Sequence, residues 1–225
     1  RDMAATAAAL QRAASGELAD DRGTVRITAS DVIGAEVLPA ILARARARHQ
    51  GIAFELVLSN RNENLLVREA DIAVRMVRPA QQSLIVRRIG DVPIQLYAHK
   101  SYAKRRGLPK TTAELSRHDV IGYDAQPLVI DGLRGQGLDV TREAFALRTD
   151  SDLAQIALLR AGAGIGGLQR QLAQRDRTLL PVLHGALRLP LEMWLVMHED
   201  LRTTRRVRLI YDLLAEGLTA YVRGR

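Results

Sequence analysis

Residues 24–29 (TVRITA) form the first apolar run of the chain, and a polar Ser30-Asp31 pair follows them directly. Beyond this turn the apolar positions recur at helical spacing up to residue 48, which predicts an amphipathic helix. Pro39 has no backbone N–H, so it must lie in the first turn of that helix or kink it. A strand that runs into a helix offers a ligand-binding edge, because open α/β sheets bind ligands beyond the carboxyl ends of their strands.

Two more strands are predicted at residues 53–58 and 71–76, with a short helix at residues 62–69 between them. Strand and helix therefore alternate through this part of the chain. Alternation of this kind implies right-handed crossovers and a parallel sheet.

The rest of the chain is predicted to complete the first α/β half, which extends to about residue 98, and then to build a second one. Strands are expected at residues 83–89, 92–98, 119–123, 145–148, 165–168, 179–183 and 191–198. Helices are expected at residues 100–107, 112–116, 153–161, 169–174 and 205–220. The last helix should pack on the first half, so the chain crosses twice between two lobes, an arrangement that makes a hinged cleft. The predicted lobe I comprises residues 23–98 and 199–225, and lobe II comprises residues 99–198.

Composition excludes several classes of protein. The 225 residues include no cysteine, so a disulfide framework and thiolate metal sites are ruled out, and a reducing cytoplasm is compatible. No apolar run is long enough to span a membrane, and the first residues lack the apolar core of a signal peptide. Because the chain starts at Arg1 rather than Met, we expect that something precedes it.

The net charge of +8 has two interpretations. It can reflect nucleic-acid contact, or arginines on solvated helix faces in a sequence with GC-rich coding bias. Aromatic residues make up only 4% of the chain, which argues against a stacking platform for single strands. The charge is also scattered rather than concentrated in blocks, which favours the second interpretation.

No catalytic or cofactor motif emerges. Gly162, Gly164 and Gly167 have the spacing of a dinucleotide-binding fingerprint, but they follow a predicted helix and precede a strand, which is the reverse of the required order. A tight helix-to-strand turn explains them better. The five histidines are far apart in the sequence, and no nucleophile elbow or P-loop is present. We therefore expect neither an enzyme nor a bound metal or cofactor.

Polar residues gather at the predicted carboxyl ends of strands in both halves. In the first half they are Ser30, Asp31, Ser59, Asn60 and Arg75, and in the second Tyr123, Asp124 and residues 149–152. Each alone suits a helix cap or a turn. Together they mark the position where a two-lobed α/β protein would build its pocket. Arg75 ends a buried strand, so it needs a carboxylate, either from a ligand or from a neighbouring acid such as Asp31.

Four blocks occur in a characteristic order: GTVRITASDVIGAEVLPAILARARARHQ, LLVREADIAVRM, LRTDSDLAQIALLRAGAGIG and LEMWLVMHEDLRTTRRVRLIYDLLAEGL. They resemble the effector-binding (regulatory) domain of LysR-type transcriptional regulators across about residues 20–222. The resemblance implies a type 2 periplasmic-binding-protein fold, with two Rossmann-like lobes around a cleft for a small-molecule inducer. Residues 1–22 then resemble the end of the family's linker helix.

The resemblance also implies partners. Such domains form homodimers, the whole proteins are commonly tetramers, and an N-terminal winged helix-turn-helix reads DNA. That DNA-reading domain has no counterpart in these residues, so this chain alone should not bind an operator specifically. A free-standing solute-binding protein with the same cleft is the alternative, against which the absent signal peptide and the leading helix argue.

The family's effector contacts, combined with the strand-end argument, fall on Ser30, Asp31, Ser59, Asn60, Arg75, Tyr123, Asp124, Ile130, Asp131 and Asp150. Its dimer interface falls on the helix at residues 36–48 and the one at residues 153–161, at Val37, Ile41, Arg44, Ala45, Arg48, Gln155, Leu158 and Leu159. Many members have an uncharged residue at the position of Asp31. The extra carboxylate favours a cationic or hydroxyl-rich effector over a plain anion.

Overall fold

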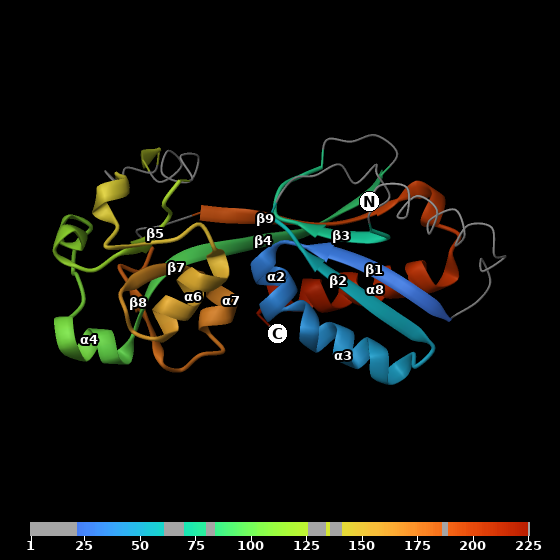
Figure 1. The fold of residues 1–225 in the computed structure, drawn as a ribbon, viewed down its shortest axis with the longest axis horizontal. Helices are drawn as coiled ribbons and strands as arrows, with labels where there is room; N and C mark the ends of the chain where they lie inside the picture. The colour runs from blue at the N-terminus through green and yellow to red at the C-terminus, as the bar shows by residue number, and fades with distance from the viewer. Residues whose placement is uncertain are drawn as a thin grey trace. The chain divides into compact units, whose positions relative to one another are not determined.

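The structure is a computed structural model that describes residues 22–60, 70–79, 84–125, 134–135, 141–185 and 189–224. The predicted linker helix and the predicted helix at residues 62–69 lie outside these ranges, as do Ile130 and Asp131. The chain forms two compact units: one runs to Asp91 and resumes at Glu192, and the other covers Val92–Leu191 (Figure 1).

The first unit is built on a mixed sheet whose parallel part confirms the predicted parallel pairing. Strands β2 (Ile52–Leu58) and β3 (Ile72–Arg75) both pair in parallel with β1 (Gly23–Ala29). Strand β9 (Leu189–His198) then pairs antiparallel with β3, and β4 (Leu84–His99) follows it in the strand order. The three parallel strands end together, since Ala29 lies opposite both Leu58 and Val74.

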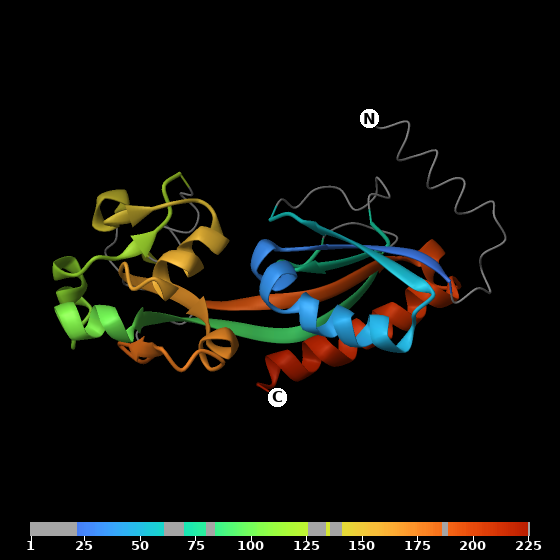
Figure 2. The ribbon, with the colours of Figure 1, turned by 60° about the horizontal axis from the view of Figure 1, so that its bottom comes forward.

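Helices cover one face of this sheet. The predicted single helix after β1 is in fact two, α2 (Asp31–Glu36) and α3 (Leu38–Arg48), because Val37 breaks the first and Pro39 needs a first-turn position in the second. Helix α8 (Arg205–Val222) contacts both β1 and α3, which confirms its predicted packing on the first half. Figure 2 shows α3 and α8 on the same side of the sheet.

Apolar side chains of the sheet and of the helices that cover its one face meet in the core of the first unit. The buried residues of β1, α2, α3 and α8 include Val25, Ile27, Ala29, Ile33, Leu38, Ile41, Ile210, Leu214 and Leu218. The contact between α3 and α8 is close: a Cβ on Gly217 would lie 2.8 Å from Ile41 Cδ1. Glycine at this position lets the two helices approach.

The second unit combines short strands with helices. The antiparallel partners of the second half of β4 are β7 (Ile165–Gln169) and β8 (Leu179–Val182). A separate two-stranded parallel sheet pairs β5 (Ile121–Gly122) with β6 (Leu147–Arg148). The helical segments of this unit are α4 (Lys100–Arg106), η3 (Ala113–Arg117), η4 (Arg142–Ala144), α6 (Asp152–Arg160) and α7 (Arg170–Ala173).

Two long strands, β4 and β9, belong to both units. The sequence predicts a break at Gly90-Asp91, but β4 continues through it, with Gly90 at a φ of +148°. A backbone φ in this region is accessible to glycine without steric cost, so the strand can bend and continue. The boundaries of the two compact units fall inside these strands, between residues 91 and 92 and between residues 191 and 192. The lobe boundaries after residues 98 and 198 stay a prediction.

The glycine-rich segment is the predicted helix-to-strand turn. Gly162 has a φ of +73° and follows the last turn of α6, as a glycine after a helix C-terminus does. Gly164 allows a close backbone contact, because a Cβ there would lie 2.4 Å from the carbonyl oxygen of Asp119. That carbonyl accepts a hydrogen bond from the N–H of Ile165 at 2.8 Å.

Within the described part of the chain, no helix is long and apolar enough to cross a membrane.

Candidate functional site

The parallel register of the first unit brings the predicted strand-end residues together. The strand ends hold three of the predicted residues: Ser30 directly follows β1, Ser59 directly follows β2, and Arg75 is the last residue of β3. Each is one position past a residue in the register that pairs Ala29 with Leu58 and with Val74. Backbone hydrogen bonds tie the same edge: the N–H of Ser30 donates to Val74 O, and the N–H of Ser59 donates to Ala29 O. The sequence-based placement of this group is thus reproduced by the sheet itself.

Ser30 does not cap the helix that follows it. Its carbonyl accepts the N–H of Gly34 at 2.8 Å, but its side chain makes no capping hydrogen bond to α2. Its Oγ is buried and has no hydrogen-bond partner in the described structure. Leaving a buried hydroxyl unpaired costs about 1–3 kcal/mol, so a hydroxyl in this state is a candidate for a ligand contact.

Asp31 and Asn60 hold each other across the edge. The N–H of Asp31 donates to Asn60 Oδ1 at 3.0 Å, and Asn60 Nδ2 donates to Asp31 Oδ2 at 3.3 Å. The amide oxygen of Asn60 therefore accepts a hydrogen bond from a backbone N–H in the first turn of α2, where the Ser30 side chain makes no capping bond. This pairing also sets the orientation of the Asp31 carboxylate.

Arg75 is buried beside Thr28, which is not among the residues predicted to form the site. Arg75 Nη2 donates to Thr28 Oγ1 at 3.0 Å, and Nη1 donates to Val74 O at 3.3 Å. The two residues are 8% and 7% exposed. Thr28 lies on the sheet face opposite Val25 and Ile27, and a polar residue on that alternate position of β1 is the signal that could have identified it.

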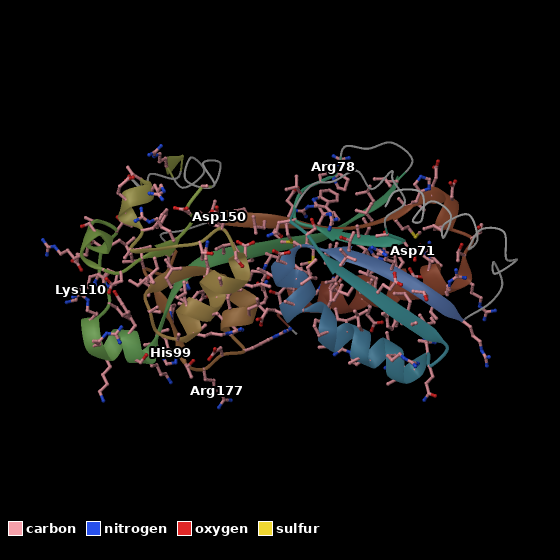
Figure 3. The ribbon with its side chains drawn as sticks, in the orientation of Figure 1. Asp71, Arg78, His99, Lys110, Asp150 and Arg177 are labelled. Carbon is pink, nitrogen blue, oxygen red and sulfur yellow. The ribbon has the colours of Figure 1, made fainter. Side chains whose placement is uncertain are left out.

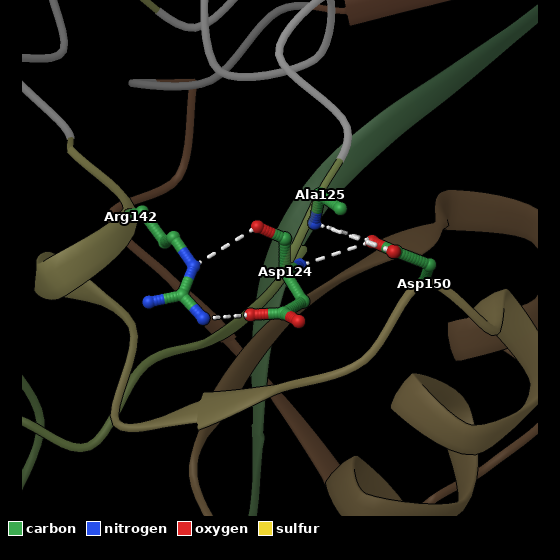
Figure 4. A network of polar contacts seen from close by, with 4 residues as sticks. All are labelled: Asp124, Ala125, Arg142 and Asp150. Atoms are coloured by element: carbon green, nitrogen blue, oxygen red, sulfur yellow. Dashed lines mark hydrogen bonds and ion pairs between the residues drawn. The ribbon is translucent and has the colours of Figure 1, made fainter.

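In the second unit, the predicted acids are engaged in local structure. Asp150 accepts the backbone N–H groups of Asp124 and Ala125, both at about 3 Å. The guanidinium of Arg142 pairs with the Asp124 carboxylate and also donates through Nε to the Asp124 carbonyl at 3.1 Å (Figure 4). Asp124 and Asp150 thus have structural partners that account for their position. Arg142 was missed because its partners are far away in the sequence.

Tyr123 donates its hydroxyl hydrogen to Asp152 Oδ1 at 2.7 Å. Burial, followed by the carboxylates of Asp152 and Asp150, raises the pKa of Tyr123 well above its usual value. The Asp152 carboxylate accepts the proton of a neutral phenol and would repel a phenolate, so this contact favours the protonated form. Tyr123 is therefore a hydrogen-bond donor at neutral pH.

We expect the Tyr123→Phe variant to lose about 1–2 kcal/mol of unfolding free energy at neutral pH, because the bond to Asp152 is removed. A raised folded-state pKa stabilises the protein below the unfolded pKa of about 10, and this stabilisation falls as the pH rises above that value. The gap between variant and wild type should therefore narrow in alkali. Urea unfolding at neutral pH and above pH 10 tests this, and a gap that widens would contradict it.

The eight residues predicted at a dimer interface differ in how far they are exposed to solvent. Five of them are buried inside the chain itself, where they have structural neighbours: Val37, Ile41, Ala45, Gln155 and Leu159. Gln155, for instance, donates through Nε2 to Thr149 O at 2.9 Å. Arg44 and Arg48 are exposed and Leu158 is half-buried, so these three reach the surface.

Three of the five histidines, His99, His118 and His198, have side chains that cap a helix or take part in a hydrogen bond. His99 Nδ1 accepts the N–H of Ser101 at the start of α4, and His198 Nδ1 accepts the N–H of Asp200. His118 lies 3.1 Å from the Tyr102 hydroxyl. Among the described residues, no three histidines or acids are grouped as a metal site would require.

Comparison with known proteins is consistent with this geometry. Residues 19–219 match the family described as LysR substrate binding domain. The chain is 29% identical to the HTH-type transcriptional activator AaeR of Escherichia coli K12 over 153 residues, which is 64% of this chain and 47% of that protein. It is 24% identical to the HTH-type transcriptional regulator CrgA of Neisseria meningitidis serogroup C, over 88% of this chain and 68% of that one.

Solved structures give the same fold. The CrgA regulatory domain of Neisseria meningitidis aligns with a TM-score of 0.76 at 23% identity, covering 88% of this chain and 99% of that one. The full-length virulence activator AphB of Vibrio cholerae aligns with a TM-score of 0.73 at 19% identity, covering 95% of this chain and 75% of that one. The fold is thus that of LysR regulatory domains, which is type 2 periplasmic-binding-protein-like, as the resemblance predicted. The chain spans about half the length of AaeR.

Proposed function

This chain belongs to the family of LysR substrate binding domains, and from this premise we propose that it senses a small-molecule effector for a LysR-type transcriptional regulator. The relatives it matches are transcriptional regulators rather than enzymes. Operator binding would then reside in a DNA-reading domain of the whole protein, working in the cytoplasm. Effector binding would change the equilibrium between conformations of the domain and so control DNA binding.

The observation that carries the proposal is the hydroxyl of Ser30. A buried oxygen without a partner is unfavourable unless something else satisfies it, and this one stands at the carboxyl edge of a parallel sheet. Buried Arg75 adds a positive charge at the same edge, and Asp31 adds a negative one held by Asn60. An effector that hydrogen-bonds to the Ser30 hydroxyl through its own hydroxyl or amino group suits this edge.

We propose Ser30, Asp31, Ser59, Asn60 and Arg75 as the effector-contacting group, and Thr28 as the residue that holds Arg75 in position. Asp124 and Asp150 are better explained as anchors of the 124–125 turn. Tyr123 stays a candidate only as an acceptor through its hydroxyl oxygen, because its hydroxyl hydrogen is donated to Asp152.

We further propose homodimer formation through surfaces that the chain itself leaves uncovered. Among the described strands, β2 is at the edge of its sheet, and its apolar Leu56, Val57 and Leu58 are each over a third exposed. A long exposed apolar edge is an association site unless another chain covers it. The exposed side of α3, with Arg44, and the half-buried Leu158 of α6 complete the proposed interface. The whole regulator would use this dimer within a tetramer.

The Ser30→Ala variant tests the binding edge in two ways. Without ligand it should be as stable as wild type or more stable, because the unpaired buried hydroxyl is removed. A thermal-shift screen of organic acids, aromatics, amino acids and hydroxylated analogues should identify a ligand that stabilises wild type. That stabilisation should fall in Ser30→Ala and in Arg75→Ala.

Ser116→Ala is the matched control, since its hydroxyl is exposed and already donates to Ala113 O. The control should respond to the ligand as wild type does. A ligand that stabilises Ser30→Ala and Arg75→Ala as strongly as wild type would show that the effector binds elsewhere.

A further inference from the structure

The second unit carries a cationic surface that the proposed effector site does not use. Of the 33 lysines and arginines in the sequence, only Lys100, Lys104 and Lys110 are lysines, and all three fall in one short stretch. The first two lie in α4, and the third follows it after Gly107. All three lysines of the chain are thus confined to one stretch, and every other lysine or arginine position is an arginine.

The described contacts bring two further cations to this surface. Lys100 N–H donates to Thr178 O at 2.9 Å, which places Arg177 next to the start of α4. Arg106 Nη2 donates to Arg117 O at 3.1 Å, which places Arg117 next to its end. We call the five residues Lys100, Lys104, Lys110, Arg117 and Arg177 the lysine face. Figure 3 shows Lys110, His99 and Arg177 on the part of this unit that carries α4.

All five side chains of the lysine face are exposed, and none has an ion pair within the described part of the chain. The nearby acids are used for other contacts. Asp119 pairs with Arg106 at 3.6 Å, and Glu114 accepts the backbone N–H of Lys110 at 2.9 Å. Asp176 accepts both the N–H and the hydroxyl of Thr178. These three acids are outnumbered by the five cations of the lysine face together with Arg105 and Arg106, so the surface keeps a net positive charge.

Helix stability does not explain this arrangement. Lys104, Arg105 and Arg106 lie in the last turn of α4, where cations complement the helix dipole. Lys100, however, is the first residue of the helix, where a cation opposes the dipole, and α4 has no acid in its first turn. A position that disfavours positive charge but holds it points to a partner outside the chain.

The geometry points to the phosphate backbone of duplex nucleic acid as the partner of the lysine face. Lysine is a compact, hydrated charge on a flexible stem, which suits phosphate contacts that carry no sequence information. Lys100 and Lys104 are four residues apart and so lie on one side of α4. An acidic protein partner is disfavoured, because protein interfaces need apolar anchors, and none of the described large exposed apolar residues lies on this surface.

This contact is independent of the proposed effector site and of operator reading by another domain. It predicts that the 225-residue chain binds duplex DNA of random sequence weakly at low salt. Fluorescence anisotropy over a series of KCl concentrations measures both the affinity and its salt dependence. Each lost phosphate contact lowers the slope of log K against log salt by about 0.9, so the Lys100→Gln, Lys104→Gln, Lys110→Gln triple variant should lower it by about 2.7.

Two matched triple variants complete the design. Lys→Arg at the same three positions should keep the affinity, because the charge is kept. Gln at Arg202, Arg208 and Arg223, exposed cations of the first unit, removes the same charge elsewhere and should leave the slope unchanged. Circular dichroism checks that each variant is folded. Undetectable binding by wild type, an equal loss in the control triple, or binding to polyglutamate in place of DNA would each overturn the assignment.

Discussion

The Leu158→Glu variant is expected to run as a monomer under conditions in which we expect the wild-type chain to form the proposed dimer. Leu158 is a half-buried residue of α6, and Leu159 beside it is fully buried in the second unit. If a partner chain covers Leu158, a carboxylate there must be desolvated against apolar surface, which costs several kcal/mol. A loss of about 2 kcal/mol already weakens association about thirtyfold. Light scattering over a concentration series gives the mass.

The control for this substitution is Gln174→Glu, which adds the same charge at an exposed position just after α7. It should leave the mass of the dimer unchanged. Val57→Lys on the exposed edge strand β2 probes the other half of the proposed interface and should also favour the monomer. A Leu158→Glu chain that associates as tightly as wild type would contradict the proposed interface.

The Gly164→Ala variant should lose about 2–4 kcal/mol of unfolding free energy. The added methyl group would lie 2.4 Å from the carbonyl oxygen of Asp119, and a backbone atom cannot move aside as a side chain can. Relief of the clash would separate the 119–120 segment from β7, which breaks the hydrogen bond from Ile165 N–H to that carbonyl. Urea unfolding followed by circular dichroism measures the loss.

Gly166→Ala is the internal control for this prediction. A methyl group at Gly166 would meet its nearest neighbours at 3.6 Å, which is ordinary van der Waals contact. It should change the stability by less than about 1 kcal/mol, because the strand loses nothing by gaining a small side chain. Equal losses in the two variants would mean that the general cost of replacing glycine, rather than the contact with Asp119, determines the stability here.

The spacing of apolar residues along the sequence predicted an element well where a single strand-like or helix-like spacing runs through it. The apolar alternation of β1 and the helical spacing of α8 both correspond to elements of the predicted type. Local pattern failed where tertiary pairing decides. Gly90-Asp91 reads as a break, yet β4 continues through it, because pairing on either side maintains the strand. Val37 has the apolar period of a helix interior, yet the helix breaks there.

The candidate site shows the same division. Ser30, Ser59 and Arg75 were predictable, because parallel strands bring their carboxyl ends to one edge and each residue directly follows or ends a strand. The role of Thr28 was not, because its contact to Arg75 joins residues far apart in the sequence. The same holds for Arg142, whose partner Asp124 is identified only once the second unit is folded. The unpaired state of Ser30 Oγ is a property of packing and has no sequence signature.

The most direct test of the effector-sensing account is calorimetric titration of the stabilising ligand into wild type, Ser30→Ala and Ser116→Ala. We expect Ser30→Ala to bind the ligand about tenfold or more weakly than wild type, because a hydrogen bond to a buried hydroxyl that is otherwise unpaired contributes about 1–3 kcal/mol. Ser116→Ala should bind like wild type. Equal affinity for all three proteins would contradict the assignment of the effector site to the edge at Ser30.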